Sequence, residues 1–452
     1  MNDLSGNEIT FTPSDNDKRI HFTLNFSDDR GHSESITSDT YTVANKTELM
    51  AFTADVYDLF IGSSEDEGNN WTWGDAVNPV ELDTVTDTYK EIYYPNAATD
   101  NKGNIIVVMQ SEYYEAFGGE YDVVYSYSND NGATFSEISL INQYDTADSR
   151  YDEDAKIATD GNGHWVATWY SGEDTLSDNL TGLGTDGDVV YAVSTDNGAT
   201  FGEPQVLGEF ASTDSTNDRM PGIAMSDDIW TIVWANRRDL TGGSGTDEDI
   251  VASYSEDQGA TWSAPVYVNS NATEDDSTDY FPRIAMNKSG FAVAVWSGRK
   301  LSDDLDIYAA VSLDSGKTWG ESSLINQYGL SDGSSDQDYP NHVEVTEDNI
   351  AVITWEGKNP DNGTDDDVYF SVTTDKGVNW SAEKTMNPNA DSDTENHQAL
   401  TINQTPDGKW IAVYNDYTNE VSYLRKSDDL VTWSGEVLLK DSVYYSSSLL
   451  FH

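Results

Sequence analysis

The most regular feature of the chain is a short alternation of apolar and polar residues. It is clear in DVVYAVS at 188–194 and again in DIYAAVS at 306–312. Ahead of these runs stand pairs of similar runs joined by a short polar turn, as in PGIAMSDDIWTIVW at 221–234 and PRIAMNKSGFAVAVW at 282–296. A period of two, with β-branched and aromatic residues, is typical of strands. The pattern predicts groups of antiparallel strands.

An eight-residue motif follows the third strand of each group. It has the form Ser/Thr-x-Asp-x-Gly-x-x-aromatic, and five strong copies occupy 128–135, 194–201, 255–262, 312–319 and 373–380. Weaker copies stand at 64–71, at 27–34 and at 426–433, the last keeping Asp428 and Trp433. A hydroxyl and a carboxylate that accept backbone N–H groups, with a glycine at positive φ, favour a tight turn. We expect each octet to join the third and fourth strands of a repeat.

Eight octets in 452 residues correspond to one repeat for about 56 residues. Four-stranded units arrayed radially form a β-propeller. The sequence therefore predicts an all-β protein, a single propeller domain over residues 1–452. Eight blades are the first expectation and seven the alternative. The two ends of the chain are expected to share the closing blade, with strands from about 7–38 and from 444–452.

The charge of the chain limits its partners. It has 82 acidic and 23 basic side chains, a net charge of −59. Such a surface repels phosphates and anionic headgroups, and no run of 18 apolar residues exists, so we expect no nucleic acid and no membrane insertion. The 12% of aromatic residues argue against disorder, and the lack of cysteine excludes disulfides and thiolate sites. We interpret the charge as adaptation to high salt; the alternative is an acidic marine or extracellular protein.

Residues that recur at the same position in most repeats are explained by the architecture. The Asp that opens third strands and the Trp that ends second strands are therefore interpreted as structural: Asp58, Asp122, Asp188, Asp249, Asp306 and Asp367, and Trp169, Trp234, Trp296 and Trp355. Arginine behaves differently, because five of the nine lie in two adjacent repeats: Arg219, Arg237, Arg238, Arg283 and Arg299. One hypothesis is a bidentate site for a carboxylate or sulfate group on a sugar. The other is local charge balance against nearby Asp residues.

Acidic loops precede several third strands, for example TDED at 246–249 and TDDD at 364–367. Clustered oxygens could bind Ca²⁺, with Asp365, Asp366 and Asp367 as the candidate ligands. Solvated acidic loops are the favoured interpretation, because the spacing is not that of a dedicated calcium loop, and no cofactor is expected to be required. His342 and His397 are interpreted as loop or strand residues rather than metal ligands.

The octets resemble the Asp boxes (BNR repeats) of the sialidase-like superfamily, and the resemblance covers most of the chain. Arg219-Met220-Pro221 is similar to the Arg-Ile-Pro that opens the first blade of sialidases. The resemblance implies that Arg219 belongs to an arginine cluster that binds a sugar carboxylate. It also implies a general acid in the following loop, for which Asp239 and Asp247 are the matches. The chain departs from the family after residue 299, where Arg425 is the only arginine.

Two functions follow. The first is non-catalytic recognition of glycans or glycosylated surface proteins, and we favour it because the arginine set is incomplete and no Tyr–Glu nucleophile pair can be assigned. The second is an exo-acting sialidase-type glycoside hydrolase. The start, MNDLSGNEITFTP, has neither the basic nor the apolar part of a signal peptide. A decoration or attachment protein on the virion of a halophile virus is the specific expectation, with a secreted protein as the alternative.

The distributed charge generates a first prediction. The melting temperature should rise between about 0.1 and 2 M monovalent salt, because the Debye length falls to about 3 Å near 1 M and repulsion among carboxylates is screened. Calorimetry across a KCl series measures this. A melting temperature that stays level throughout the series would contradict salt adaptation.

Overall fold

A computed structural model describes most of the chain. The described residues are 23–27, 33–37, 49–55, 58–64, 70–73, 91–112, 121–141, 151–172, 186–208, 216–237, 240, 247–273, 277–299, 304–330, 337–359, 363, 365–441 and 447–451. Contacts divide the chain into two compact units, 1–47 and 48–452. In the first unit, β1 (Thr23–Ser27) and β2 (Ser33–Thr37) pair as a two-stranded antiparallel sheet.

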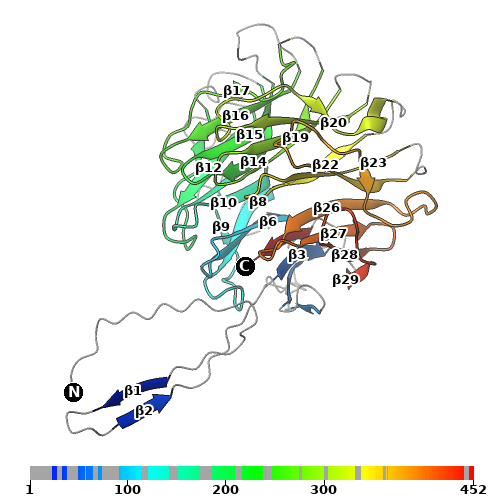
Figure 1. The fold of residues 1–452 in the computed structure, drawn as a ribbon. Helices are drawn as coiled ribbons and strands as arrows, with labels where there is room; N and C mark the ends of the chain where they lie inside the picture. Colours follow the sequence, from blue (N-terminus) through cyan, green and yellow to red (C-terminus); the bar gives the residue numbers. More distant parts are fainter. Residues whose placement is uncertain are drawn as a thin grey trace, which may run out of the picture. The chain divides into compact units, whose positions relative to one another are not determined.

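Six sheets of the second unit each consist of four consecutive antiparallel strands (Figure 1). The first strands are β6 (Glu91–Thr99), β10 (Asp152–Thr159), β14 (Asp218–Met225), β18 (Tyr280–Met286), β22 (Tyr339–Val345) and β26 (His397–Gln404). The second strands are β7 (Ile105–Glu112), β11 (Trp165–Ser171), β15 (Trp230–Asn236), β19 (Ala292–Gly298), β23 (Ala351–Gly357) and β27 (Trp410–Asp416).

The third and fourth strands complete these sheets. The third strands are β8 (Tyr121–Ser128), β12 (Asp188–Ser194), β16 (Asp249–Ser255), β20 (Asp306–Ser312), β24 (Asp367–Thr373) and β28 (Val421–Ser427). The fourth strands are β9 (Ser139–Leu140), β13 (Gln205–Val206), β17 (Val266–Tyr267), β21 (Ser323–Leu324), β25 (Lys384–Thr385) and β29 (Val437–Asp441). A 3₁₀ turn, η1 (Gln327–Leu330), follows β21, and no helix in the described part of the chain is long and apolar enough to cross a membrane.

A further four-stranded sheet is composite, because it joins the two ends of the second unit. Its order is β30 (Ser447–Phe451), β3 (Leu49–Asp55), β4 (Asp58–Ser64) and β5 (Thr72–Trp73). β30 and β3 are antiparallel, with Phe451 opposite Leu49. Successive first strands contact one another, and β30 contacts both β26 and β6. The sheets therefore form a closed β-propeller whose first strands are innermost.

The ends share a sheet as expected, but the expected eight blades and the N-terminal part of the closing blade are wrong. Within the described residues, the ring consists of six blades of consecutive strands and the composite four-stranded sheet, so the first expectation of eight blades is wrong. The C-terminal strand was expected to pair within about 7–38, but it pairs with β3 at 49–55. The physical reason is that an octet is only a turn. The copy at 27–34 lies between β1 and β2, and a lone hairpin can carry it without being a blade.

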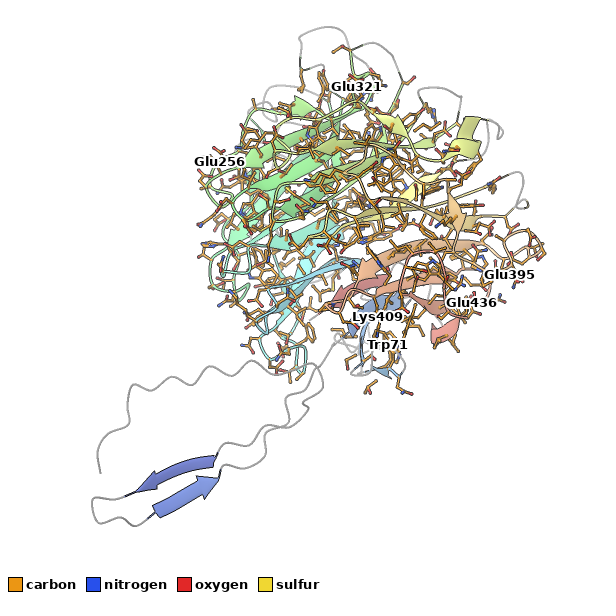
Figure 2. All side chains as sticks on the ribbon, viewed as in Figure 1. Trp71, Glu256, Glu321, Glu395, Lys409 and Glu436 are labelled. Carbon is orange, nitrogen blue, oxygen red and sulfur yellow. The ribbon has the colours of Figure 1, made fainter. Side chains whose placement is uncertain are left out.

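Apolar side chains fill the space between neighbouring sheets. Seven buried clusters are found among the described residues, one for each pair of adjacent sheets around the ring. The tryptophans interpreted as core, such as Trp234 and Trp355, are at most 2% exposed. Acidic side chains such as Glu256, Glu321 and Glu436 are exposed (Figure 2). Most second and third strands are buried at nearly every position, including DVVYAVS at 188–194, because each sheet packs between two others.

The octets form the predicted turns. At 128–135 the Gly132 N–H donates to Ser128 Oγ at 2.8 Å, and the Thr134 N–H donates to Asp130 Oδ1 at 2.9 Å. The same pattern recurs at the other four strong copies. Hydrogen bonds from Thr134 hold the pKa of Asp130 below its usual value.

One weak copy is shifted by a residue. At 426–433, Asp429 rather than Asp428 accepts the backbone N–H groups, from Val431 and Thr432 at 2.8 and 2.7 Å. Leu430 takes the left-handed conformation there, with a φ of 58°. The prediction of a turn is confirmed, but its assignment to Asp428 is wrong, because the shorter loop brings the next carboxylate into place.

Deletion of residues 447–452 should abolish cooperative unfolding of the ring. Without β30, β3 loses its inner partner and an open sheet edge is left. Deletion of residues 1–47 is the matched control and should leave the melting temperature within about 2 °C, because that unit is separate by its contacts. Calorimetry in high salt measures both, and an unchanged transition without residues 447–452 would show that ring stability does not depend on this closure.

Removal of one octet carboxylate should have a small, local cost. Asp130→Ala loses charge-assisted hydrogen bonds at an exposed turn and should lower the free energy of unfolding by about 1 kcal/mol. Asn129→Ala, at the neighbouring exposed position, should change it by less than about 0.5 kcal/mol. Chemical denaturation measures the difference, and equal effects of the two substitutions would contradict a stabilising role for the carboxylate.

Candidate functional site

Every first strand of the six consecutive blades has an irregular register near its start. In five of them a residue other than glycine has a φ between 51° and 59°: Tyr94, Asp154, Met220, Phe281 and Ala399. Such bulges bend a strand and redirect its side chains. First strands begin where second strands end, and the octets lie at the other end of the sheets. The bulges therefore gather at one face of the ring, called the mouth below.

A cavity of about 460 Å³ lies at two adjacent bulges of the mouth. Its lining residues are Tyr93, Tyr94, Gln110, Tyr121, Glu153 and Asp154. The Tyr93 and Tyr121 rings meet edge to face with centroids 6.0 Å apart, and the Tyr151 ring lies 5.9 Å from that of Tyr121. Tyr94 and Tyr151 are 46% and 50% exposed, so two aromatic rings are open to a ligand.

Charged groups lie beside and below this cavity. Burial raises the pKa of Glu153, and the charge of Asp154 adds to the shift. Burial lowers the pKa of Lys156 to about 8 and also lowers the pKa of Arg283, while Asp154 opposes both shifts. Glu356 opposes the shift of Arg283 as well. Lys156 and Arg283 occupy matching places, because each directly follows the bulge of its first strand.

On β22, His342 and Glu344 are a second pair of titratable side chains. Burial, together with the charge of Arg283, lowers the pKa of His342 to about 4. Burial raises the pKa of Glu344 to about 7, although a hydrogen bond from Asn403 opposes this shift. Three first strands therefore have a titratable side chain directly after the bulge: Lys156, Arg283 and His342.

The predicted arginines that the structure describes are at the mouth, and they have different surroundings. Arg219 Nη2 lies 2.8 Å from Glu248 Oε1, and Glu248 is buried. Arg283 is half-buried and is influenced by the charge of Asp154, whereas Arg237 and Arg299 are exposed. Arg238 lies outside the described residues. Acidic neighbours at Arg219 and Arg283 favour the interpretation as charge balance.

The structure does not support either candidate for a general acid. Asp239 lies outside the described residues, and Asp247 is only 7% exposed. Glu248, between Asp247 and Asp249, is the residue that pairs with Arg219. The role of Asp247 as an acid stays a prediction.

The acidic loops are buried rather than solvated, so the favoured interpretation of them is wrong. Their exposed fractions are at most 8% at Asp186, Asp188, Asp247, Asp249, Asp304, Asp306, Asp365 and Asp367. They lie where one blade meets the next. Asn269 Nδ2, for example, donates to Asp249 and to Asp279 of the following blade, both at 2.7 Å. Amide donors at these junctions make burial of the carboxylates tolerable.

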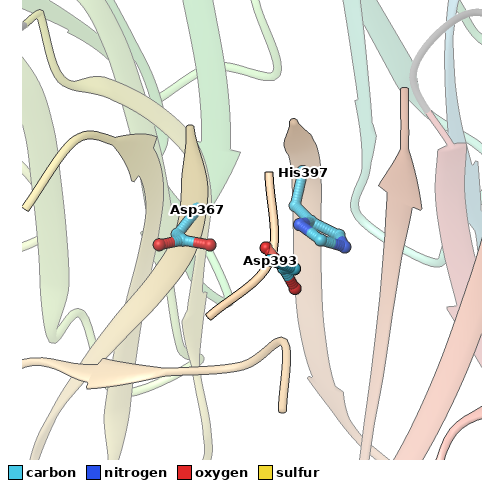
Figure 3. Close-up of side chains that lie close together, drawn as sticks. All are labelled: Asp367, Asp393 and His397. Atoms are coloured by element: carbon cyan, nitrogen blue, oxygen red, sulfur yellow. The ribbon is translucent and has the colours of Figure 1, made fainter. Parts of the chain in front are cut away.

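One junction contains a histidine. Ligand atoms of Asp367, Asp393 and His397 lie within 4.8 Å of one another (Figure 3). Burial raises the pKa of Asp367 to about 7 and that of Asp393 to about 6, with the charge of Asp365 adding to each. Of the predicted metal candidates only Asp367 belongs to this group; Asp365 is a close neighbour, and Asp366 lies 3.9 Å from Lys358 Nζ.

The sequence analysis missed the tyrosine-lined cavity and the role of His397. The cavity depends on bulges at Tyr94 and Asp154, for which no residue pattern was available. His397 could have been found by aligning the residue before or at the start of each first strand, since Asp218, Asp279 and Asp338 occupy that position elsewhere.

A second cavity, of about 490 Å³, lies between the outer strands of two blades. Its lining includes Tyr369, Phe370, Lys384 and Trp433. Tyr369 and Phe370 are 1% exposed, and Phe370 and Trp433 pack edge to face within a core cluster. These rings stabilise the contact between blades and are not open to a ligand.

No protein-family model and no curated protein matches the chain. Among solved structures, a protein of unknown function from Dyadobacter fermentans is 14% identical, over 80% of this chain and 95% of that one, with a TM-score of 0.48. The NanB sialidase from Streptococcus pneumoniae is 11% identical, over 88% and 85%, with a TM-score of 0.48. A Trypanosoma rangeli sialidase is 17% identical, over 74% and 54%, with a TM-score of 0.45. At these values no family assignment follows.

Proposed function

We propose that the protein recognises a carbohydrate without chemical conversion, and that the sugar occupies the tyrosine-lined cavity of the mouth. The observation that carries the proposal is the composition of this cavity, in which three tyrosines, a glutamine and two carboxylates line about 460 Å³. Concave sites with aromatic walls and a few polar groups are typical of small-molecule binding.

The chemistry suits a sugar. A pyranose has an apolar C–H face that can pack on an aromatic ring, and hydroxyl groups around its edge. Tyr94 and Tyr151 offer exposed rings, and Glu153 and Asp154 offer acceptors for hydroxyl groups. Gln110, 6% exposed on β7, can both donate and accept.

The electrostatics favour a neutral sugar over an acidic one. Arg219 is paired with Glu248, and Arg283 has Asp154 and Glu356 as neighbours. A carboxylate or sulfate on the ligand would compete with these acids, whereas hydroxyl groups would not. The acidic glycan inferred from the arginines is therefore the alternative ligand.

We also propose the setting of this recognition. The octet turns support membership of the sialidase-like Asp-box superfamily, and the charge of −59 supports a medium of high salt. We favour binding without hydrolysis because Asp247 is only 7% exposed. An extracellular place of action, on a virion or as a secreted protein, stays a prediction.

A glycan array in about 2 M KCl, followed by titration of the best hits, tests the proposal. Tyr94→Ala should weaken binding about 10-fold, because an aromatic contact is worth roughly 1.4 kcal/mol including its buried area. Tyr417→Ala, which removes an exposed tyrosine that does not line the cavity, should bind as the parent does.

Arg219→Ala separates the two ligand classes. If the cavity is the site, the affinity of the Arg219→Ala variant for the glycan should stay within about twofold of that of the parent. A loss of affinity of about 10- to 150-fold would favour the arginine hypothesis. Release of free sugar from a hit, abolished by Asp247→Asn, would overturn the non-catalytic assignment in favour of the hydrolase.

A further inference from the structure

The junction between the last two blades of consecutive strands differs from the others. At three earlier junctions the residue before or at the start of the first strand is an aspartate, whose N–H donates to the preceding blade: Asp218 to Gly187, Asp279 to Glu248 and Asp338 to Leu305. His397 makes the same backbone contact, to Asp366 at 2.7 Å. The histidine therefore occupies an aspartate position of the repeat.

The amide that closes the junction also changes its role. Asn269 bridges Asp249 and Asp279, and Asn326 Nδ2 bridges Asp306 and Asp338 at 3.1 and 2.5 Å. In the last junction, Asn387 Nδ2 donates only to Asp367, at 2.6 Å. With histidine in place of the second carboxylate, the amide has no acceptor on that side.

His397 has a buried nitrogen that the protein does not satisfy. The residue is 5% exposed, and its Nδ1 has no hydrogen-bond partner. The ring meets Tyr414 edge to face at 5.9 Å, which fixes its plane. Figure 3 shows a ring nitrogen on the side of Asp393. An unsatisfied polar atom costs about 1–3 kcal/mol when buried, so a partner is expected.

The third group comes from the loop ahead of β26. Asp393 is held there by a backbone hydrogen bond to Asn389, and its Oδ1 is buried without a hydrogen-bond partner. Neither Asp367 nor Asp393 forms an ion pair with lysine or arginine among the described residues. Two carboxylates and an imidazole thus meet with no cation from the protein to balance them.

We propose that Asp367, Asp393 and His397 bind a divalent transition-metal ion, such as Zn²⁺ or Mn²⁺, that fastens β24 of one blade to β26 of the next. A nitrogen ligand together with carboxylates favours such ions over Ca²⁺, which prefers six to eight oxygens. Ligands about 2.1 Å from Zn²⁺ lie at most about 4.2 Å apart, and the three ligand atoms already lie within 4.8 Å of one another, so small side-chain adjustments would bring them to a shared ion. Water completes the coordination.

The test uses the full-length protein, treated with EDTA and returned to about 2 M KCl, where unspecific binding of cations to its 82 acidic residues is screened. Titration with Zn²⁺ and Mn²⁺, with elemental analysis after gel filtration, should give one ion per chain and a higher melting temperature. With Co²⁺, a visible absorption band should report the nitrogen ligand.

Two substitutions and their controls assign the ligands. His397→Asp restores the residue found at the other junctions, and Asp393→Asn removes a loop carboxylate; each should weaken Zn²⁺ binding at least 10- to 100-fold. His397→Asp should also change the Co²⁺ band. Asp391→Asn, an exposed residue of the same loop, and His342→Gln should bind Zn²⁺ as the parent does.

Three results would overturn the proposal. They are no stoichiometric binding of either ion, equal Zn²⁺ affinity of the parent and both ligand variants, or binding of Ca²⁺ that matches Zn²⁺ and is unaffected by His397→Asp. If His397→Asp does not fold, the comparison of Asp393→Asn with Asp391→Asn still decides the matter. Glycan binding at the mouth is measured separately and does not depend on the outcome.

Discussion

The ladder between β30 and β3 is the constraint on which the ring depends. The chain has no cysteine and cannot join its ends by a disulfide. Instead, the last sheet takes strands from both ends of the second unit. The cluster that includes Trp71 and Trp73 joins this sheet to the β26 blade, and the cluster that includes Ile61 joins it to the β6 blade. Each sheet is thereby covered on both faces. In an open ring, the end blade would leave one face exposed.

Acidic residues are used in two physically distinct ways in this ring. The exposed ones contribute repulsion that salt screens, whereas those at the blade junctions are out of reach of salt and must be stabilised locally. Side-chain amides do this at Asn269 and Asn326, each of which serves carboxylates of two blades. At the junction that contains His397, the amide of Asn387 donates to Asp367 but bridges no second carboxylate. This difference from the equivalent junctions is the reason to expect another ligand there.

Much of the fold could be predicted from the sequence, because alternation and turn chemistry are local. The octet hydrogen bonds at Asp130 and the burial of Trp234 follow directly from residue type and spacing. The blade number could not be predicted by counting octets, since a turn motif does not require four strands. Nor could the burial of Asp186 or Asp247, because a run of acids resembles a solvated loop until the neighbouring blade is placed against it.

The mouth shows why the candidate site was harder to predict than the fold. The first strands share a bulge, and the residue just after it differs in every blade: Asn96, Lys156, Gly222, Arg283, His342 and Thr401. The backbone therefore repeats while the side chains at one level of the ring do not. A repeat explains the shared bulge, but only the particular side chains can give the ring specificity. Function on such a scaffold is determined by these variable positions and by the pockets between bulges, as at Tyr94 and Asp154.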